Sequence, residues 1–169
     1  MAKSKKSKSK SKTPARRTGP VDAVALLKAD HREVAGWFEQ FEKSKSDAKK
    51  AELARKICGA LKVHTQIEEE IFYPAFLEAT EDKDMHHEAE VEHDGAKQLI
   101  SQIDASGPED DYFDAKVKVL SEMIKHHVKE EEQRGGMFAE AKSAGMDLVA
   151  LGAQMKARKN ELQGKSKQQ

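Results

Sequence analysis

Apolar residues recur along this chain at spacings of three and four, which is the period of an α-helix with one buried face. The pattern predicts four long amphipathic helices followed by two shorter ones. Their expected ranges are 21–43, 48–79, 83–105, 109–134, 137–144 and 147–162.

Turn-forming residues fall between these segments. Residues 44–47 separate the first two helices, and Asp47 is expected to cap the second. Residues 106–108, Ser-Gly-Pro, end the third helix, and residues 135–136, Gly-Gly, end the fourth. Gly145 divides the two short helices, the second of which has Asp147 as its expected cap. Long helices joined by short turns predict an all-α fold, an up-down-up-down four-helix bundle with short C-terminal helices.

The domain organisation follows from the composition of the two ends. Residues 1–19 alternate Lys and Ser and offer nothing apolar to bury, so they are expected to be a disordered basic tail. The bundle is expected over residues 20–140, and a C-terminal helix with a frayed end over 141–169.

Polar side chains interrupt all four apolar stripes at one or two positions each. Every long helix carries a histidine on its stripe, and the second and fourth add a glutamate one turn later. The six residues are His31, His64, Glu68, His93, His127 and Glu131. Beyond Glu68 the expected stripe continues through Ile71 and Ala75. When residues are counted from the connecting turns, the six lie within about one to two helical turns of the same height along the bundle axis. They are therefore expected to converge on one layer.

Two buried carboxylates need a neutralising partner. A buried charge without a partner costs several kcal/mol, and no Lys or Arg shares these stripes. A bound cation is the simplest neutraliser. Imidazole and carboxylate ligands without thiolate suit iron or manganese, with zinc as an alternative. Because each carboxylate can bridge two ions, the pattern favours a di-metal centre in the bundle core.

Charge is distributed unevenly, although the net charge is zero. Residues 1–20 carry eight basic residues and no acid, so the remainder of the chain has a net charge of −8. An acidic domain is a poor ligand for nucleic acid, which leaves the tail as the one segment expected to contact it, and only weakly. The single cysteine, Cys58, excludes an intramolecular disulfide and is expected in the core. No apolar run is long enough to span a bilayer, so we expect no membrane contact. We also expect the protein to be cytoplasmic and a monomer.

At these residues the chain resembles the hemerythrin-like family, also called the HHE cation-binding domain. The resemblance covers roughly residues 21–140, and the matching segments are 30–34 (DHREV), 64–74 (HTQIEEEIFYP), 91–94 (VEHD) and 127–132 (HVKEEE). It implies two iron ions as cofactor, in an oxo- or hydroxo-bridged di-iron centre with Glu68 and Glu131 as the bridging carboxylates.

The sequence departs from that family at two places. Oxygen carriers of the family have a further histidine one turn before the one that matches His93, and here that position is Ala89. Reversible oxygen carriage is therefore not expected. The segment after Glu131 is also longer and looser than the one after Glu68, which ends in Pro74.

Several assignments stay open at this point. His126 and Glu130 are an alternative pair to His127 and Glu131, and Glu90 or His86 are alternatives for the missing imidazole. Tyr73 is interpreted as a packing residue.

Two classes of function fit the pattern. One is a redox protein whose iron binds or reacts with oxygen, peroxide or nitric oxide. The other is a protein that senses or buffers iron or oxygen and acts through a partner. A metal-free interaction scaffold is the third reading.

Overall fold

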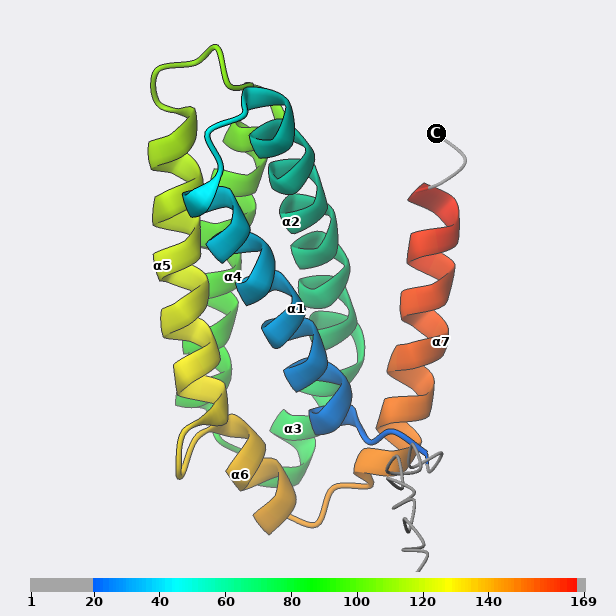
Figure 1. Cartoon of the computed structure of the whole chain (residues 1–169). Coiled ribbons are helices and arrows are strands. Elements are labelled where there is room, and N and C mark those ends of the chain that lie inside the picture. Colours follow the sequence, from blue (N-terminus) through cyan, green and yellow to red (C-terminus); the bar gives the residue numbers. More distant parts are fainter. Residues whose placement is uncertain (1–19, 167–169) are drawn as a thin grey trace, which may run out of the picture.

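The computed structural model describes residues 20–166, which form helices and turns with no strand (Figure 1). The elements are α1 (Ala23–Lys43), α2 (Asp47–Ile67), the π-helix η1 (Glu68–Phe72), α3 (Tyr73–Thr80), α4 (Lys83–Asp104), α5 (Phe113–Glu132), α6 (Met137–Ser143) and α7 (Leu148–Ser166). In Figure 1, α1, α2, α4 and α5 run alternately up and down, so the predicted all-α bundle is confirmed. The predicted disordered tail, 1–19, lies outside the described residues. The last helix continues to Ser166, past its expected end at 162.

Helix starts are fixed by side chains that accept hydrogen bonds from the first free backbone N–H groups. Asp22 accepts from Ala25 N at 2.7 Å and starts α1. The prediction that Asp47 caps the second helix is wrong by one residue, because Ser46 Oγ accepts from Lys49 N at 3.3 Å. Asp147, the expected cap of the last helix, accepts from Ala150 N at 3.0 Å.

The fourth long helix starts later than expected, at Phe113 rather than at residue 109. Asp110 Oδ1 accepts a hydrogen bond from Tyr112 N at 2.9 Å, and Asp110 N donates to Gly107 O at 2.9 Å. Such side-chain bonds give the backbone an alternative to helical pairing. The residues before Phe113 therefore form turns instead of the first turn of α5.

A π-helical segment interrupts the second predicted helix. Within η1 the N–H of Tyr73 donates to Glu68 O, five residues back instead of four. The extra residue rotates everything that follows, so Phe72 and Phe76 are fully buried. The expected stripe residues Ile71 and Ala75 are only partly buried. The apolar stripe was therefore predicted one residue out of phase after Glu68, because it assumed regular α-helical spacing.

The core consists of two apolar clusters with a polar layer between them. The upper cluster, near the α1–α2 and α4–α5 connections in Figure 1, includes Val34, Leu61, Ala96 and Leu120. It also contains Cys58, whose thiol pKa burial raises to about 12. The lower cluster includes Leu27, Ile67, Phe72, Phe76, Ala89, Met137 and Phe138. Along α1, α2 and α4, one histidine stands at the point where the chain passes from one cluster to the other.

The two C-terminal helices close the lower half of the bundle. The ring of Phe138 on α6 stacks on the His31 imidazole, with centroids 6.0 Å apart. The last helix, α7, packs against α1, α2 and η1. Gly152 allows this approach, because a Cβ there would lie 2.4 Å from Val21 O.

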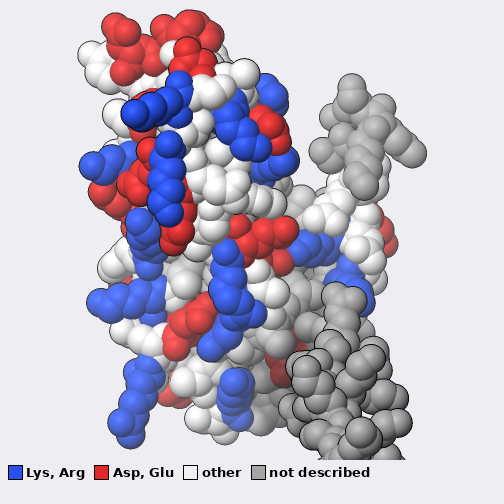
Figure 2. Space-filling model, in the orientation of Figure 1, with Lys and Arg blue, Asp and Glu red and all other residues white. Residues whose placement is uncertain are grey.

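Charged side chains of both signs cover the visible face of the bundle, with acidic ones gathered at the end that carries the α4–α5 connection (Figure 2). Among the described residues, no helix combines the length and the apolarity that a membrane span requires.

Candidate metal centre

Six polar side chains from five elements of the bundle meet in the layer between the two apolar clusters. Each of the six is at most 8% exposed. They are His31 on α1, His64 on α2, Glu68 on η1, His93 on α4, and His127 and Glu131 on α5. The structure therefore brings together all six residues that the sequence predicted for the site.

The donor atoms of these side chains form two groups. His31, His64, Glu68 and Glu131 make up one group, and Glu68, His93 and His127 make up the other. In the first group, His31 Nε2 lies 3.1 Å from His64 Nε2 and 3.4 Å from Glu131 Oε2. In the second, His93 Nε2 lies 3.2 Å from His127 Nε2 and 3.3 Å from Glu68 Oε2.

The two carboxylates connect the groups. Glu68 Oε2 lies 3.2 Å from His64 Nε2 and 3.3 Å from His93 Nε2, one atom of each group. The two oxygens of Glu131 divide, with Oε2 facing His31 and Oε1 lying 3.5 Å from His127 Nε2. This is the arrangement that a pair of cations needs from bridging ligands.

The separations fit a shared metal ion. Ligands about 2.0–2.2 Å from an ion lie about 2.8–3.6 Å apart at octahedral or tetrahedral angles. The distances between neighbouring donor atoms, 3.1–3.5 Å, lie in that range.

Three carboxylate oxygens of the layer accept no hydrogen bond from the protein. Both oxygens of Glu68 and Oε2 of Glu131 are buried without a hydrogen bond. Burial raises the pKa of Glu68 to about 7, and burial together with the nearby Glu68 carboxylate raises the pKa of Glu131 well above its ordinary value. Buried unpaired carboxylates are costly unless a cation neutralises them, so these residues fit a bound metal.

Two histidines of the layer, His31 and His93, have pKa values that burial lowers, so their rings are neutral at pH 7. Burial, reinforced by the neighbouring histidines, lowers the pKa of His31 to about 2. Burial and His127 lower the pKa of His93 to about 4. Both rings therefore carry a free nitrogen lone pair at pH 7, which is the form that coordinates a metal.

All four histidines are oriented in the same way, with Nε2 toward the centre and Nδ1 against a carboxylate. A carboxylate on Nδ1 holds the proton there, fixes the ring and leaves Nε2 free to coordinate. The four pairs are His31 with Glu132 (2.7 Å), His64 with Asp30 (3.4 Å), His93 with Glu69 (3.0 Å) and His127 with Glu92 (2.7 Å).

These supporting carboxylates are sequence neighbours of the centre's own residues, but each supports the histidine of another element. Asp30 precedes His31 and holds His64, whereas Glu132 follows Glu131 and holds His31. The supports thus form a closed ring around the bundle, from α1 to α2, η1 to α4, α4 to α5 and α5 back to α1.

A basic side chain, three lysines and one histidine, lies against each supporting carboxylate in turn. The pairs are Lys159 with Asp30, Lys97 with Glu69, Lys28 with Glu132 and His126 with Glu92. Lys159 comes from α7, so the C-terminal helix takes part in positioning His64 through Asp30.

A comparison with known protein families identifies the domain in which this arrangement lies. Residues 22–135 match the hemerythrin HHE cation binding domain. The chain belongs to this family. The match covers the four long helices and all six residues of the layer, so the buried His and Glu groups lie in a domain that binds metal cations.

Two other proteins resemble this HHE domain. A solved structure, a hemerythrin HHE cation binding domain-containing protein from Mycobacterium kansasii, shares the fold with a TM-score of 0.71 and 23% identity. The alignment covers 86% of this chain and 89% of that one. A protein named DNA nickase from a Nostoc species is 29% identical over 107 residues, which are 63% of this chain and 30% of the relative. The chain therefore matches less than a third of that relative's length.

Tyr73 of this HHE domain packs in the lower cluster, as interpreted from the sequence, but its hydroxyl also reaches the polar layer. Its hydroxyl lies 3.1 Å from His93 Nε2 and 3.3 Å from Glu131 Oε1. The π-helix explains the position of the hydroxyl, because its extra residue turns Tyr73 toward the centre. The sequence carried no distinct sign of this rotation.

The open alternatives separate clearly in the structure. The His126 side chain is 61% exposed and pairs with Glu92, whereas His127 and Glu131 are buried in the layer. Glu90 is exposed and lies 3.7 Å from His86 Nδ1, away from the six converging residues. The geometry thus favours His127 and Glu131 over the rival pair, while their role as ligands stays a prediction.

The four supporting carboxylates were missed by the sequence reasoning, which considered only the polar residues on the apolar stripes. A sign was present in the sequence, since each adjoins one of the six residues. Adjacency alone gives no direction, however, because consecutive helical residues point about 100° apart.

Proposed function

We propose that this HHE domain holds a non-haem di-iron centre and reacts with a small oxidant, namely oxygen, peroxide or nitric oxide. The ligands are His31, His64, Glu68, His93, His127 and Glu131. The observation that carries the proposal is the pair of donor groups linked by Glu68 and by the divided oxygens of Glu131.

Iron is favoured over other metals by the donor chemistry. The site offers imidazole and carboxylate groups and no thiolate, since Cys58 is buried in the upper cluster. Such ligands suit iron and manganese. Four imidazoles favour iron over harder ions, which prefer sites made only of oxygen ligands. When bound, a pair of iron ions would supply the redox equivalents that turnover of a small oxidant requires.

The protein's own residues orient the histidine rings and limit the size of the small molecule that can bind. The carboxylates on Nδ1 hold the four rings in place, and the Tyr73 hydroxyl can donate a proton or a hydrogen bond beside His93 and Glu131. A cavity of about 10 Å³ is lined by all four histidines and by apolar residues such as Val34, Leu61 and Ile124. That space is about the size of one water molecule, which supports a diatomic or similarly small ligand.

Metal analysis of the purified protein is the first test. Protein from iron-replete cells is expected to contain close to two iron atoms per chain and to absorb in the near ultraviolet. A fully folded preparation that stays metal-free after incubation with ferrous iron would contradict the proposal.

Substitution in α5 tests the ligand assignment. His127→Ala is expected to lose at least one metal ion per chain, because His127 Nε2 faces the centre. His126→Ala is the matched control, and it should lose little because the exposed His126 side chain pairs with Glu92 instead of the centre. Equal losses in the two variants would contradict the assignment.

A sensing or buffering role, in which the domain acts through a partner, is the alternative function. The two roles differ in turnover. Iron-loaded protein that consumes peroxide or nitric oxide catalytically supports the redox role, whereas stoichiometric binding without turnover supports sensing.

A further inference from the structure

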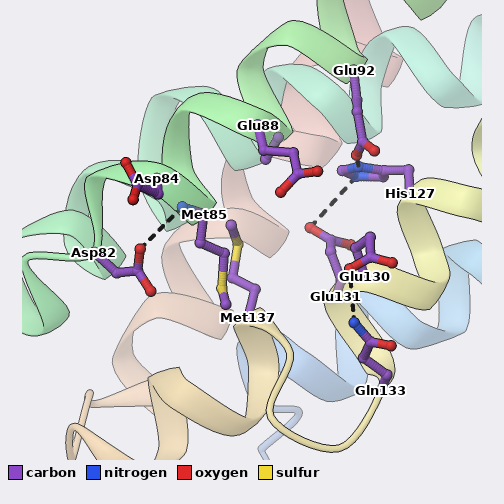
Figure 3. A pocket seen from close by; sticks show the side chains of 11 residues that line it. Asp82, Asp84, Met85, Glu88, Glu92, His127, Glu130, Glu131, Gln133 and Met137 are labelled. Carbon is purple, nitrogen blue, oxygen red and sulfur yellow. Dashed lines mark hydrogen bonds and ion pairs between the residues drawn. The ribbon is translucent and has the colours of Figure 1, made fainter.

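A pocket of about 330 Å³ opens beside the proposed centre, between the first half of α4, the end of α5 and the start of α6 (Figure 3). Its inner end is formed by His127 and Glu131, two of the proposed ligands. Met85 and Met137 form one wall, where their side chains lie next to each other in Figure 3. The pocket therefore connects the surface with the centre.

The pocket lining is strongly acidic. Six of its eleven lining residues are Asp or Glu and none is Lys or Arg. Glu88 extends its carboxylate over the space next to Glu131 in Figure 3, and Glu88 has no ion pair within residues 20–166. At the bottom, Glu131 is 2% exposed and its Oε2 has no hydrogen-bond partner. A buried carboxylate oxygen without a hydrogen bond thus lies at the inner end of an acidic cleft.

The pocket meets the centre on its less crowded side. The donor group of His93 and His127 has three members, whereas the group of His31 and His64 has four. Ala89, which is 5% exposed, lines the pocket and leaves space next to this smaller group. An incoming ion or ligand entering here would meet the position with the fewest protein donors.

We propose that this pocket is an electrostatically selective entrance to the metal centre, which admits divalent cations and uncharged small molecules and disfavours anions. The proposal rests on the metal centre proposed above. A cleft lined by charges of one sign focuses the field, raises the local concentration of counter-ions and accelerates their association by about 10- to 1,000-fold. Ferrous ions would be drawn in, and hydrogen peroxide, which is uncharged at pH 7, would enter without an electrostatic barrier.

The test uses Glu88→Lys in the full-length protein, because Glu88 is exposed, is not one of the six converging residues and can be replaced without disturbing the core. Metal-free protein is mixed rapidly with ferrous iron, and the rate of metal uptake is followed by absorbance at low and at high salt. We expect uptake about 3- to 10-fold slower at low salt with an unchanged final iron content. At about 1 M salt the difference should disappear, because charges are then screened beyond about 3 Å.

Azide binding supplies a second readout of opposite sign. Azide is an anion, so iron-loaded Glu88→Lys should bind it several-fold more tightly than the unmodified protein does. A mere distortion of the site would weaken both processes, whereas an electrostatic entrance slows cation uptake and strengthens anion binding.

Glu122→Lys is the control variant. It makes the same charge change on the exposed face of α5, about 12 Å along the helix from Glu130. It should leave both readouts close to those of the unmodified protein. Equal effects of the two substitutions, or no effect of Glu88→Lys, would overturn the entrance while leaving the metal centre intact. Failure of the unmodified protein to take up any metal would instead overturn the proposed function.

Discussion

Each imidazole in this bundle has two nitrogens, of which only one can coordinate a metal at the centre. In all four rings a carboxylate lies next to Nδ1, which leaves Nε2 free to face the centre. The carboxylates do more than orient the rings, because a hydrogen bond to a negative acceptor also makes the opposite nitrogen a stronger donor. Carboxylates next to the six converging residues in sequence thus orient the histidines of another element.

Replacing one of these carboxylates by its amide should weaken metal binding without removing a ligand. In Glu132→Gln, the partner of His31 Nδ1 becomes neutral while its size is kept. We expect a loss of about 10- to 100-fold in metal affinity, measured by competition with a chelator. Glu122→Gln is the control on the same helix, and an affinity equal to that of the unmodified protein in both variants would contradict this role.

The hydroxyl of Tyr73 lies within hydrogen-bond distance of His93 Nε2 and of Glu131 Oε1. Tyr73→Phe keeps the ring and its packing but removes this polar group. Metal content should stay near two ions, since all six proposed ligands remain. Peroxide turnover should fall about 10- to 100-fold, because the group able to deliver a proton beside the centre is lost. Unchanged turnover would leave Tyr73 with a packing role only.

At the scale of helices, the sequence predicted the elements because its four long apolar stripes repeat at spacings of three and four, which is the period of an α-helix. It also predicted which histidines face inward, since His31, His64, His93 and His127 interrupt those stripes. It failed after Glu68, where the π-helix inserts one residue. A single extra residue costs little energy locally, and π-bulges concentrate at functional sites. The position of Tyr73 therefore depends on tertiary contacts that the periodicity of one helix does not encode.

The last helix was the element whose role sequence reasoning described least. The HHE match ends at residue 135, yet α7 packs on α1, α2 and η1 and sends Lys159 to Asp30. Arg158 adds a two-pronged ion pair to Glu70, at 2.6 and 3.0 Å. The last helix lies beyond the residues that match the family, yet it contacts Asp30, the carboxylate that holds His64.

Gly152→Ala should disturb this junction. The added Cβ would lie 2.4 Å from Val21 O and 2.7 Å from Ala23 N, and backbone atoms cannot move aside cheaply. We expect a loss of about 1–3 kcal/mol in the free energy of unfolding, measured by denaturant titration. Gly164→Ala on the same helix is the control, because a methyl group there would meet nothing within 4 Å and the change should be neutral or stabilising. Equal effects would show that the approach of α7 to α1 is not tight.

For the whole molecule, the polar layer is a cost that the two apolar clusters offset. Within residues 20–166, fourteen buried residues form the upper cluster and thirteen the lower one, and we expect this core to fold without metal. Metal binding then adds stability in proportion to the logarithm of the free metal concentration over its dissociation constant. The fold and the centre are therefore separable, and substitutions should be able to move them in opposite directions.

The double variant Glu68→Gln with Glu131→Gln tests this opposition. The two carboxylates lie together, nearly unexposed, and burial raises the pKa of both because their charged forms are disfavoured there. Removing carboxylates whose charged form burial disfavours is expected to stabilise the metal-free fold. Without metal, the variant should therefore unfold at a higher temperature than the unmodified protein. About 1 kcal/mol corresponds to about 2–4 °C for a chain of this size. With ferrous iron present the order should reverse, since the variant has lost both bridging groups and gains little from the metal. Calorimetry of both proteins, with and without iron, measures all four unfolding temperatures. A variant less stable than the unmodified protein in the metal-free state would mean that the two glutamates hold the layer together by themselves.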